Sequence, residues 1–120
     1  MVKRKADIVG NVQTNFKGGE GDVTMYNFLT EQEAKGAGRL FARSVLEPGC
    51  SIGSHQHDGD GEAYYILTGT ALISDNGTDV TLGAGDCQIC ADGQSHSIKN
   101  VGKDTLEYIA IILYTKQKDM

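Results

Sequence analysis

The sequence predicts an all-β fold, a small antiparallel β-barrel or jelly roll, from three observations. Its 120 residues include 16 glycines but one proline, and glycines spread along a chain are typical of many tight turns. Short runs of alternating apolar and polar residues recur at a spacing of about 8–12 residues, with turn residues between them. Strands do not alternate with helical patterns, so a parallel α/β sheet is not expected.

The N-terminal part of the chain is the least patterned. Residues 1–21 are polar and dotted with glycine. We expect them to form an arm that packs on the barrel, with Ile8 and Val9 as its clearest strand residues. Residues 22–28 alternate well enough to form a strand.

One short helix is expected before the main strands. Thr30 and Glu33 have the spacing of a capping box, in which each side chain bonds the backbone amide of the other. Glycine suits the C-terminal end of a helix, and Gly36 and Gly38 stand where one or two turns would end.

From residue 39 onward the pattern is almost wholly β. Alternation and turn signals predict strands at 39–47, 62–68, 71–74, 79–82, 87–90, 96–99 and 105–115. Pro48–Gly49 is a turn pair, and Asn76–Gly77 is the strongest short hairpin signal because both residues take positive φ in such a turn. No linker is visible, so we expect a single domain over 1–120 with its barrel core at 39–115.

Composition and charge argue against several classes of partner. The chain has 16 acidic and 11 basic residues, a net charge of −5, so its surface is expected to repel nucleic acid and anionic membranes. The basic run at residues 3–5 is better interpreted as a solvated terminus than as a DNA-binding arm. No apolar run reaches the ~18 residues of a membrane span, and no secretory signal is visible. Three cysteines fit no closed disulfide framework, so we expect a cytoplasmic protein.

Three histidines and one glutamate form the most informative pattern. His55 and His57 are two residues apart and would point to the same face of an extended strand, and Glu62 follows a Gly-rich loop. His96 stands at the start of another predicted strand. Imidazole nitrogen and carboxylate oxygen suit Zn, Fe, Mn, Ni or Cu, and such a set leaves coordination positions open. A His-x-His pair alone is a weak signal, because scattered histidines are more often surface or satisfied core residues.

The spacing around these residues resembles the two sequence motifs of the cupin family. The residues that match the first motif are Gly49, His55, His57, Glu62 and Gly69. Those that match the second are Gly85, Gly93, His96 and Asn100. The family usually has proline at the position of Ala91, and its loss removes rigidity before a turn but no ligand.

This resemblance implies a barrel that holds one divalent transition-metal ion inside it, with Mn, Fe, Zn, Ni and Cu left open. Carried over residue by residue, the implied metal ligands are His55, His57, Glu62 and His96. The motif glycines would be turn positions, and Asn100 would hold a hairpin by hydrogen bonds.

Strand alternation adds candidates beside the ligands. If Glu62 faces inward, Tyr64 and Ile66 also do, and Ile98 joins His96 as lining. Tyr64 is therefore a candidate catalytic residue or donor toward a metal-bound ligand. The alternative is a packed aromatic ring with a satisfied hydroxyl.

Arg43, on the strand that leads into the first motif, is the best-placed cation for an anionic substrate and a second catalytic candidate. A surface arginine is the alternative, and Arg39 shares its parity but lies farther from the motif. Cys87 and Cys90 have C-x-x-C spacing, but residues three apart on a strand face opposite sides. We interpret both as small apolar strand residues rather than a redox or zinc pair.

The fold does not decide the chemistry, because function belongs to the site. The resemblance implies a small metalloenzyme that acts on a small organic acid, sugar derivative or phenolic compound, of dioxygenase, decarboxylase, lyase or isomerase type. The alternative is a non-catalytic module that binds or senses a small metabolite through its metal. A storage or structural role is disfavoured by the complete ligand set. The C-terminal run 108–114 is apolar on both faces, so either the arm or a second subunit should cover it, and we expect a homodimer.

Overall fold

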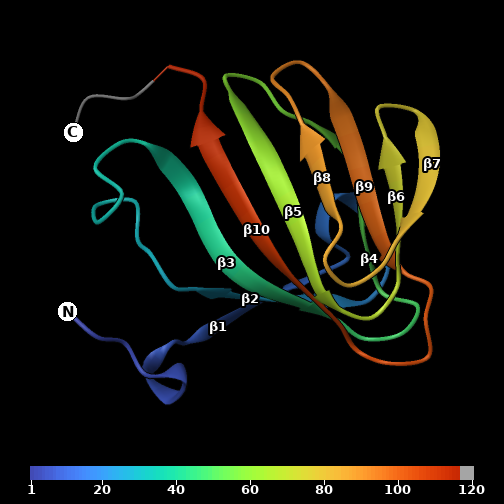
Figure 1. The fold of residues 1–120 in the computed structure, drawn as a ribbon, viewed down its shortest axis with the longest axis horizontal. Coiled ribbons are helices and arrows are strands. Elements are labelled where there is room, and N and C mark those ends of the chain that lie inside the picture. The colour runs from blue at the N-terminus through green and yellow to red at the C-terminus, as the bar shows by residue number, and fades with distance from the viewer. Residues whose placement is uncertain (117–120) are drawn as a thin grey trace.

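The computed structural model describes residues 1–116 as ten strands in two antiparallel sheets (Figure 1), and residues 117–120 lie outside this description. The six-stranded sheet has the order β1-β2-β3-β10-β5-β8, and the four-stranded sheet has the order β4-β9-β6-β7. The strands are β1 (Gly10–Thr14), β2 (Asp22–Asn27), β3 (Gly38–Leu46), β4 (Ser51–Gln56), β5 (Asp60–Thr68), β6 (Ala71–Asp75), β7 (Thr78–Leu82), β8 (Cys87–Cys90), β9 (Ser95–Asn100) and β10 (Leu106–Tyr114). The predicted all-β fold is confirmed.

Inward-facing side chains of the two sheets form one apolar core. Ile66 of β5, Ile73 of β6 and Ile98 of β9 are fully buried there. Burying a side chain of this size contributes about 1.5–3 kcal/mol to folding. The predicted alternation on β5 is confirmed, because Tyr64 and Ile66 face inward whereas Tyr65 is 48% exposed. The barrel is therefore filled by side chains from both sheets.

The short helix predicted after Thr30 is present only as a single hydrogen-bonded turn. The capping box forms, since Glu33 N donates to Thr30 Oγ1 at 3.1 Å and Thr30 N donates to Glu33 Oε1 at 2.9 Å. Lys35 and Gly36 then adopt left-handed backbone, with φ of 53° and 78°, and no second turn follows. The start signal was correct, but the backbone reverses too soon for a helix.

Two strand assignments also differ from the sequence prediction. The strand of the arm is β1, which begins at Gly10, whereas Val9 precedes it and is 84% exposed. Residues 51–56 form a separate strand, β4, where only the histidine pair was expected to be extended. Asn100 has the role that the resemblance implied, because its Nδ2 donates to the carbonyls of Leu46 and Asp104 at 2.8 and 2.9 Å.

The N-terminal arm joins one sheet and then packs on the other. Strand β1 pairs with β2, and the 3-10 turn η2 (Phe16–Gly18) lies against β4; an earlier turn, η1 (Lys5–Asp7), precedes β1. Gly19 and Gly53 make this contact possible, because a Cβ on either would collide with backbone of the facing segment. The arm is thereby held against the strand that carries His55.

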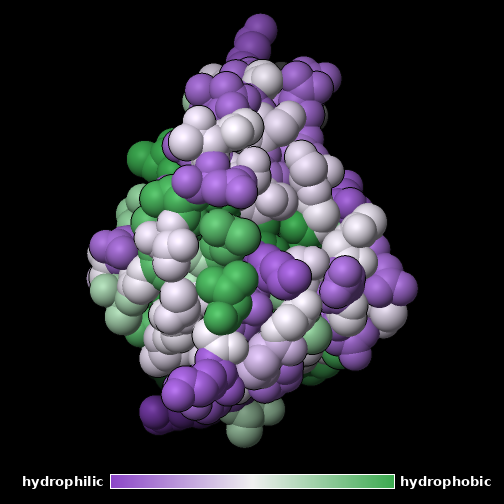
Figure 2. Space-filling model, turned by 90° about the vertical axis from the view of Figure 1, so that its right-hand side faces the viewer, coloured by the Kyte–Doolittle hydropathy of each residue, from purple (hydrophilic) through white to green (hydrophobic). Residues whose placement is uncertain are grey.

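Large apolar side chains remain exposed on the outer face of the six-stranded sheet. Tyr65, Leu67, Ile89 and Leu113 point outward and are between 37% and 68% exposed. Viewed from the β6–β7 side, the surface also has hydrophobic side chains gathered near its middle with polar ones around them (Figure 2). The helical segments within residues 1–116 are single turns, and none is suited to crossing a membrane.

Candidate metal centre

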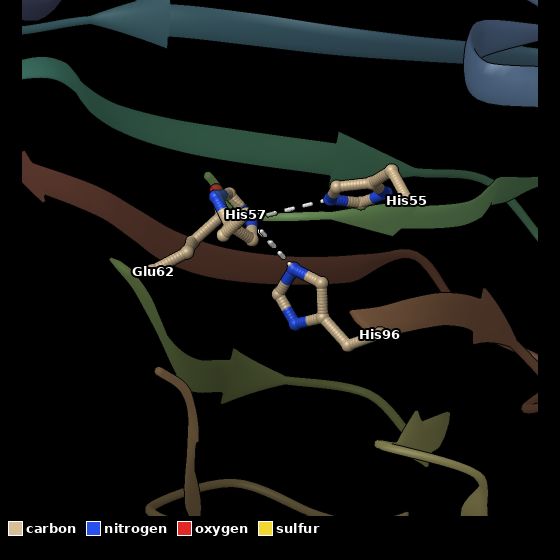
Figure 3. A group of neighbouring side chains, drawn as sticks. All are labelled: His55, His57, Glu62 and His96. Atoms are coloured by element: carbon tan, nitrogen blue, oxygen red, sulfur yellow. Dashed lines mark hydrogen bonds and ion pairs between the residues drawn. The ribbon is translucent and has the colours of Figure 1, made fainter. Parts of the chain in front are cut away.

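Four side chains from both sheets converge inside the barrel (Figure 3). His55 lies on β4, His96 is its partner on β9, and His57 follows the end of β4. The short connection after His57 leads into β5 of the other sheet, which carries Glu62. The structure thus brings together the four residues to which the family resemblance pointed.

The donor atoms of these side chains are close enough to share one ion. The Oε1 atom of Glu62 lies 2.9 Å from Nε2 of His96, 3.1 Å from that of His57 and 3.6 Å from that of His55. The Nε2 atoms of His57 and His96 are 3.1 Å apart. Ligand atoms about 2.1 Å from one ion, at angles of roughly 90–109°, lie about 3.0–3.4 Å from each other. The donor set and its spacing therefore fit a divalent metal ion.

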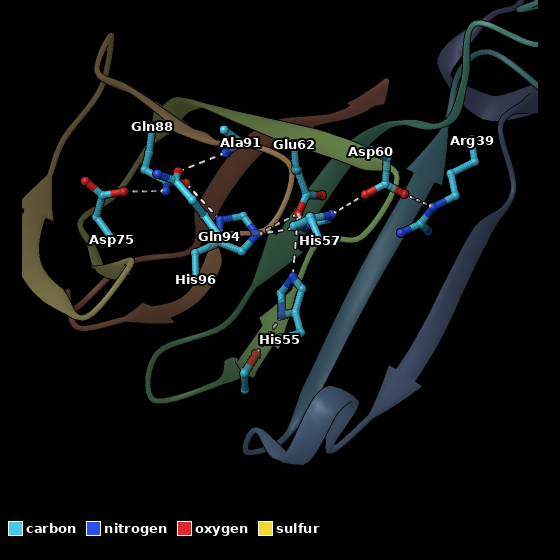
Figure 4. Close-up of polar contacts among 11 residues, drawn as sticks. Arg39, His55, His57, Asp60, Glu62, Asp75, Gln88, Ala91, Gln94 and His96 are labelled. Carbon is cyan, nitrogen blue, oxygen red and sulfur yellow. Dashed lines mark hydrogen bonds and ion pairs between the residues drawn. The ribbon is translucent and has the colours of Figure 1, made fainter. Parts of the chain in front are cut away.

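Each histidine is held through its other ring nitrogen by an acceptor (Figure 4). The partners of the Nδ1 atoms are Gly53 O for His55 at 2.8 Å, Asp60 Oδ1 for His57 at 2.7 Å and Gln88 Oε1 for His96 at 2.9 Å. Because all three partners accept, we infer that each Nδ1 carries a proton and donates it. The three Nε2 lone pairs then face one another and a carboxylate, an arrangement that a cation at the centre satisfies.

Two of these acceptors are themselves fixed by side chains. Arg39 Nε donates to Asp60 Oδ2 at 2.9 Å, and Gln88 Nε2 donates to Asp75 Oδ1 at 3.0 Å. The bond to Asp75 orients the amide of Gln88 so that its oxygen faces His96. Asp60 and Gln88 are both 5% exposed, and buried bonds of this kind hold ligand rings in place.

The packing of three imidazoles around one carboxylate shifts several pKa values. Burial alone would raise the pKa of Glu62, but the three imidazole rings around its carboxylate favour the charged form and lower the pKa below its usual range. The hydrogen bond to Glu62 raises the pKa of His57, against the effect of burial. Burial lowers the pKa of His96. Glu62 is therefore an anion and His96 a neutral ring near pH 7, the forms that bind a metal.

A cavity of about 180 Å³ lies beside these groups and is lined in part by His55, His57 and Glu62. Its apolar walls are formed by Phe16, Met25, Leu40, Ile52, Ala110 and Ile112. The remaining polar groups of the lining are Lys17, Arg39, Ser44, Gln56, Tyr64 and Tyr108. An apolar pocket with a few convergent polar groups is typical of a small-molecule site.

Tyr64, predicted to share the site, lines this cavity and packs on a ligand ring. Its ring is stacked on the imidazole of His96, with centroids 4.6 Å apart and planes 7° from parallel. Burial raises the pKa of Tyr64 well above its usual value, and the Glu62 carboxylate raises it further. The Tyr64 hydroxyl therefore remains a donor at neutral pH, and its ring supports the position of His96.

Arg43, the predicted cation for an anionic substrate, does not line the cavity. It points outward from β3, where its Nη1 pairs with Glu107 Oε1 at 2.6 Å. Its guanidinium carbon also lies 4.4 Å from the ring centroid of Tyr26. These contacts match the alternative considered for Arg43, a surface arginine.

Arg39 lines the cavity in place of Arg43, and a bulge is the reason. The ladder between β3 and β10 pairs Ile112 with Leu40 and then Leu113 with Gly38. Arg39 therefore has no pairing partner on β10. A residue left unpaired by a bulge no longer follows the alternation of its strand. Arg39 therefore reaches the cavity lining, with its side chain 45% exposed, whereas Arg43, of the same parity, points outward.

Four further residues of the site were not predicted: Lys17, Asp60, Gln88 and Tyr108. Gln88 and Tyr108 lie on the inward side of predicted strands, so strict use of alternation could have found them. Asp60 belongs to the Gly-rich loop expected between His57 and Glu62, where strand alternation does not apply. Lys17 reaches the cavity through packing of the arm, for which the sequence has no local signal.

The chain is similar to known proteins over most of its length. A protein-family model described as "Cupin domain" matches residues 42–112. An oxalate-binding protein of Thermotoga maritima is 43% identical over 113 residues, which cover 94% of this chain and 93% of that protein. A crystal structure described as a predicted oxalate decarboxylase from Thermotoga maritima has a TM-score of 0.91 and 43% identity, and the match covers 95% of this chain and 99% of that chain.

More distant structures share the fold alone. Ectoine synthase from P. lautus has a TM-score of 0.73 at 14% identity, over 95% of this chain and 78% of its own. The family model, by contrast, spans more than half of the chain and includes all four converging side chains. Together with the relative of 43% identity, this match shows that the chain belongs to the cupin family.

Proposed function

We propose that this chain binds one divalent transition-metal ion, Mn, Fe, Zn, Ni or Cu, through His55, His57, Glu62 and His96. The ion and the cavity together take up a small organic acid, for which oxalate is the first candidate. One observation carries the proposal: three ring nitrogens and a carboxylate oxygen face one another beside a cavity whose other charged side chains are cations.

The charge of the cavity supports an acidic ligand. The chain has a net charge of −5, yet the charged side chains that join Glu62 in the lining, within residues 1–116, are Lys17 and Arg39. Asp60, outside the lining, balances the charge of Arg39, and a divalent ion would add two positive charges against the negative charge of Glu62. A cleft with this balance favours anions over neutral molecules.

The size of the cavity supports a small ligand. Its volume of about 180 Å³ is below the roughly 300–1,000 Å³ of pockets for drug-sized ligands, so a molecule of a few non-hydrogen atoms fits. Oxalate is such a molecule. The Thermotoga maritima relative at 43% identity is named an oxalate-binding protein, which supports the same choice.

Binding is favoured over catalysis by the lack of a free acid or base in the cavity. Glu62 is the one carboxylate in the described lining, and it is a proposed metal ligand. Burial raises the pKa values of Tyr64 and Tyr108, so their hydroxyls are weak acids. Decarboxylation requires a proton for the carbon that loses CO₂. A decarboxylase remains the second candidate because the Thermotoga maritima structure is described in that way.

Metal analysis of protein purified without an affinity tag, followed by calorimetric titration with oxalate, tests this proposal. We expect about one ion per chain, and oxalate binding that disappears when a chelator removes the ion. Failure to hold any of the five metals after reloading would contradict the proposal. So would oxalate binding that survives removal of the metal. Release of CO₂ and formate from oxalate would decide for the decarboxylase.

Lys17→Gln is expected to weaken oxalate binding by about 3- to 10-fold at low ionic strength and by less in high salt. Lys17 is exposed to solvent, so added salt screens the attraction between its ammonium group and the bound anion. The measurement is calorimetry at two salt concentrations. Lys5→Gln, which removes an exposed charge outside the cavity, is the control. Equal effects of the two substitutions would argue against recognition by Lys17.

Asp60→Asn is expected to lower the metal affinity by about 10- to 100-fold. An asparagine oxygen can still accept from His57, but the negative charge that increases the basicity of the ring is lost. The ion pair with Arg39 is lost as well. Competition with a chromogenic chelator measures the affinity. Asp58→Asn, at an exposed neighbouring carboxylate, is the control, and an unchanged affinity of Asp60→Asn would contradict the role of Asp60.

We also propose that two copies of the chain pair through the outer face of the six-stranded sheet. β10 buries Tyr108 and Ala110 on one side and presents Ile109, Ile111 and Leu113 on the other, where Leu113 is 49% exposed. An apolar face of this kind is typical of a subunit contact. Light scattering of the purified protein should give twice the mass of the chain, and a monomeric mass would refute the dimer. A cytoplasmic location is also proposed, in keeping with three free cysteines.

A further inference from the structure

Tyr108 has a buried hydroxyl group that lies near Ser44 but makes no hydrogen bond of good geometry within residues 1–116. Its ring lies in the middle of β10 and is fully buried. Among the described residues, Tyr108 Oη is the one buried side-chain polar atom without a hydrogen-bond partner. Buried hydroxyls almost always have a partner, and one that lacks it lowers stability. This unpaired donor needs an explanation.

The Tyr108 ring is held in place by packing. Tyr64 contacts it edge-on, with centroids 5.0 Å apart and planes at 72°. Tyr64 in turn stacks on His96, so the two tyrosine rings form a continuous contact with the metal centre. On the other side, Tyr108 is paired with Ser44 across the β3–β10 ladder. The hydroxyl therefore has a fixed position and cannot turn out to bulk water.

The position of this hydroxyl points to a ligand. Tyr108 lines the same cavity as His55, His57 and Glu62. Burial raises the pKa of Tyr108, so its oxygen keeps its proton and donates at neutral pH. A carboxylate accepts hydrogen bonds and cannot donate them, and an O–H donor toward it gives one of the stronger hydrogen bonds in proteins.

We propose that Tyr108 Oη donates a hydrogen bond to a carboxylate oxygen of the small acid that occupies the cavity at the metal. Tyr108 is then a ligand-recognition residue, and the unpaired donor in the free protein finds its acceptor when the acid binds. The inference rests on the proposed function, because it requires an acid in this cavity. The competing explanation is a bond with the hydroxyl of Ser44, which is near enough to lower the pKa of Tyr108 against the effect of burial.

Tyr108→Phe tests the inference, because it removes one oxygen and leaves the ring. Tyr65→Phe is the matched control: it makes the same deletion on β5, at a ring that points outward and is 48% exposed. Three quantities are measured for each variant and for the wild type. They are the thermal midpoint of the metal-free protein, the affinity for Zn²⁺, and the affinity of the Zn²⁺-loaded protein for oxalate.

For Tyr108→Phe we expect a metal-free midpoint equal to or above that of the wild type, because an unpaired buried group is lost. Zn²⁺ affinity should stay within about threefold, and oxalate should bind about tenfold more weakly. Tyr65→Phe should change none of the three. A lower midpoint for Tyr108→Phe, as expected from a lost bond to Ser44, would overturn the inference. Equal oxalate binding by wild type and Tyr108→Phe would also overturn it, whereas a wild type that binds no oxalate would overturn the proposed function as well.

Discussion

His96→Ala is expected to lower the metal affinity by at least about 100-fold, so that the protein is isolated without its ion. A four-ligand metal site contributes about 10–16 kcal/mol, and removal of one ligand takes away on the order of 3 kcal/mol of this. The metal-free protein should also unfold at a lower temperature. His96 is fully buried, its ring stacks on Tyr64, and its Nδ1 is the partner of Gln88 Oε1. The alanine leaves a cavity and an unpaired buried acceptor.

Metal content by mass spectrometry and thermal unfolding with and without Zn²⁺ measure these two effects separately. His96→Gln retains more of the side-chain volume than alanine and indicates how much of the stability loss comes from packing. Ser97→Ala, at the adjacent outward-facing position of β9, should keep the ion and the midpoint of the wild type. A His96→Ala protein that still carries one tightly bound ion per chain would mean that this residue is not a ligand.

Acidification from pH 8 to pH 5 is expected to release the ion, with a loss of affinity of several orders of magnitude. Each imidazole must be neutral to bind, so protons compete with the metal at every ring that they occupy. The hydrogen bond to Glu62 raises the pKa of His57 above 6.5 in the metal-free protein, so competition at this ring begins above that pH. Below the pKa of a ring, affinity falls about tenfold per pH unit for each proton taken up.

In the metal-free protein, His57 and Glu62 change the free energy of unfolding in opposite directions as the pH rises. The raised pKa of His57 contributes stability below about pH 6.5 that is lost as the pH rises through its folded value. The lowered pKa of Glu62 contributes stability above about pH 4.5 that is lost as the pH falls toward its folded value. The gap between the midpoints of Zn²⁺-loaded and chelated protein should therefore widen from pH 5 to pH 8. A gap of constant width would argue against histidine ligands.

The four converging side chains could be predicted because the resemblance to the two cupin motifs implies them, and the spacing of those motifs is visible along the chain. A fixed motif spacing and the period of two along a strand place Glu62 and Tyr64 on one face without any tertiary information. The same rule correctly separates Cys87, which is exposed, from Cys90, which is buried. Such predictions need only the knowledge that the segment is a strand.

The cations of the cavity could not be predicted in this way. A single bulge allows Arg39 of β3, and not the expected Arg43, to line the cavity. Bulges depend on how two strands meet, and alternation within one strand does not indicate them. Lys17 is placed by the close contact of Gly19 with β4, a contact between segments about 30 residues apart in the chain. The short helix, predicted as one or two turns, has one turn for a related reason, since the left-handed backbone at Lys35 prevents its extension.

Metal binding and the positive charge of the cavity lining depend on different segments of the chain, because the arm packs on β4. The segment matched by the family model, residues 42–112, contains the whole proposed coordination sphere but neither Lys17 nor Arg39. Two cupins could therefore hold the same ion and still accept different molecules, because the cations that line the cavity are encoded outside the segment by which the family is recognised. In this chain, the arm and the start of β3 contribute the cations of the cavity, and the matched segment contributes the proposed ligands.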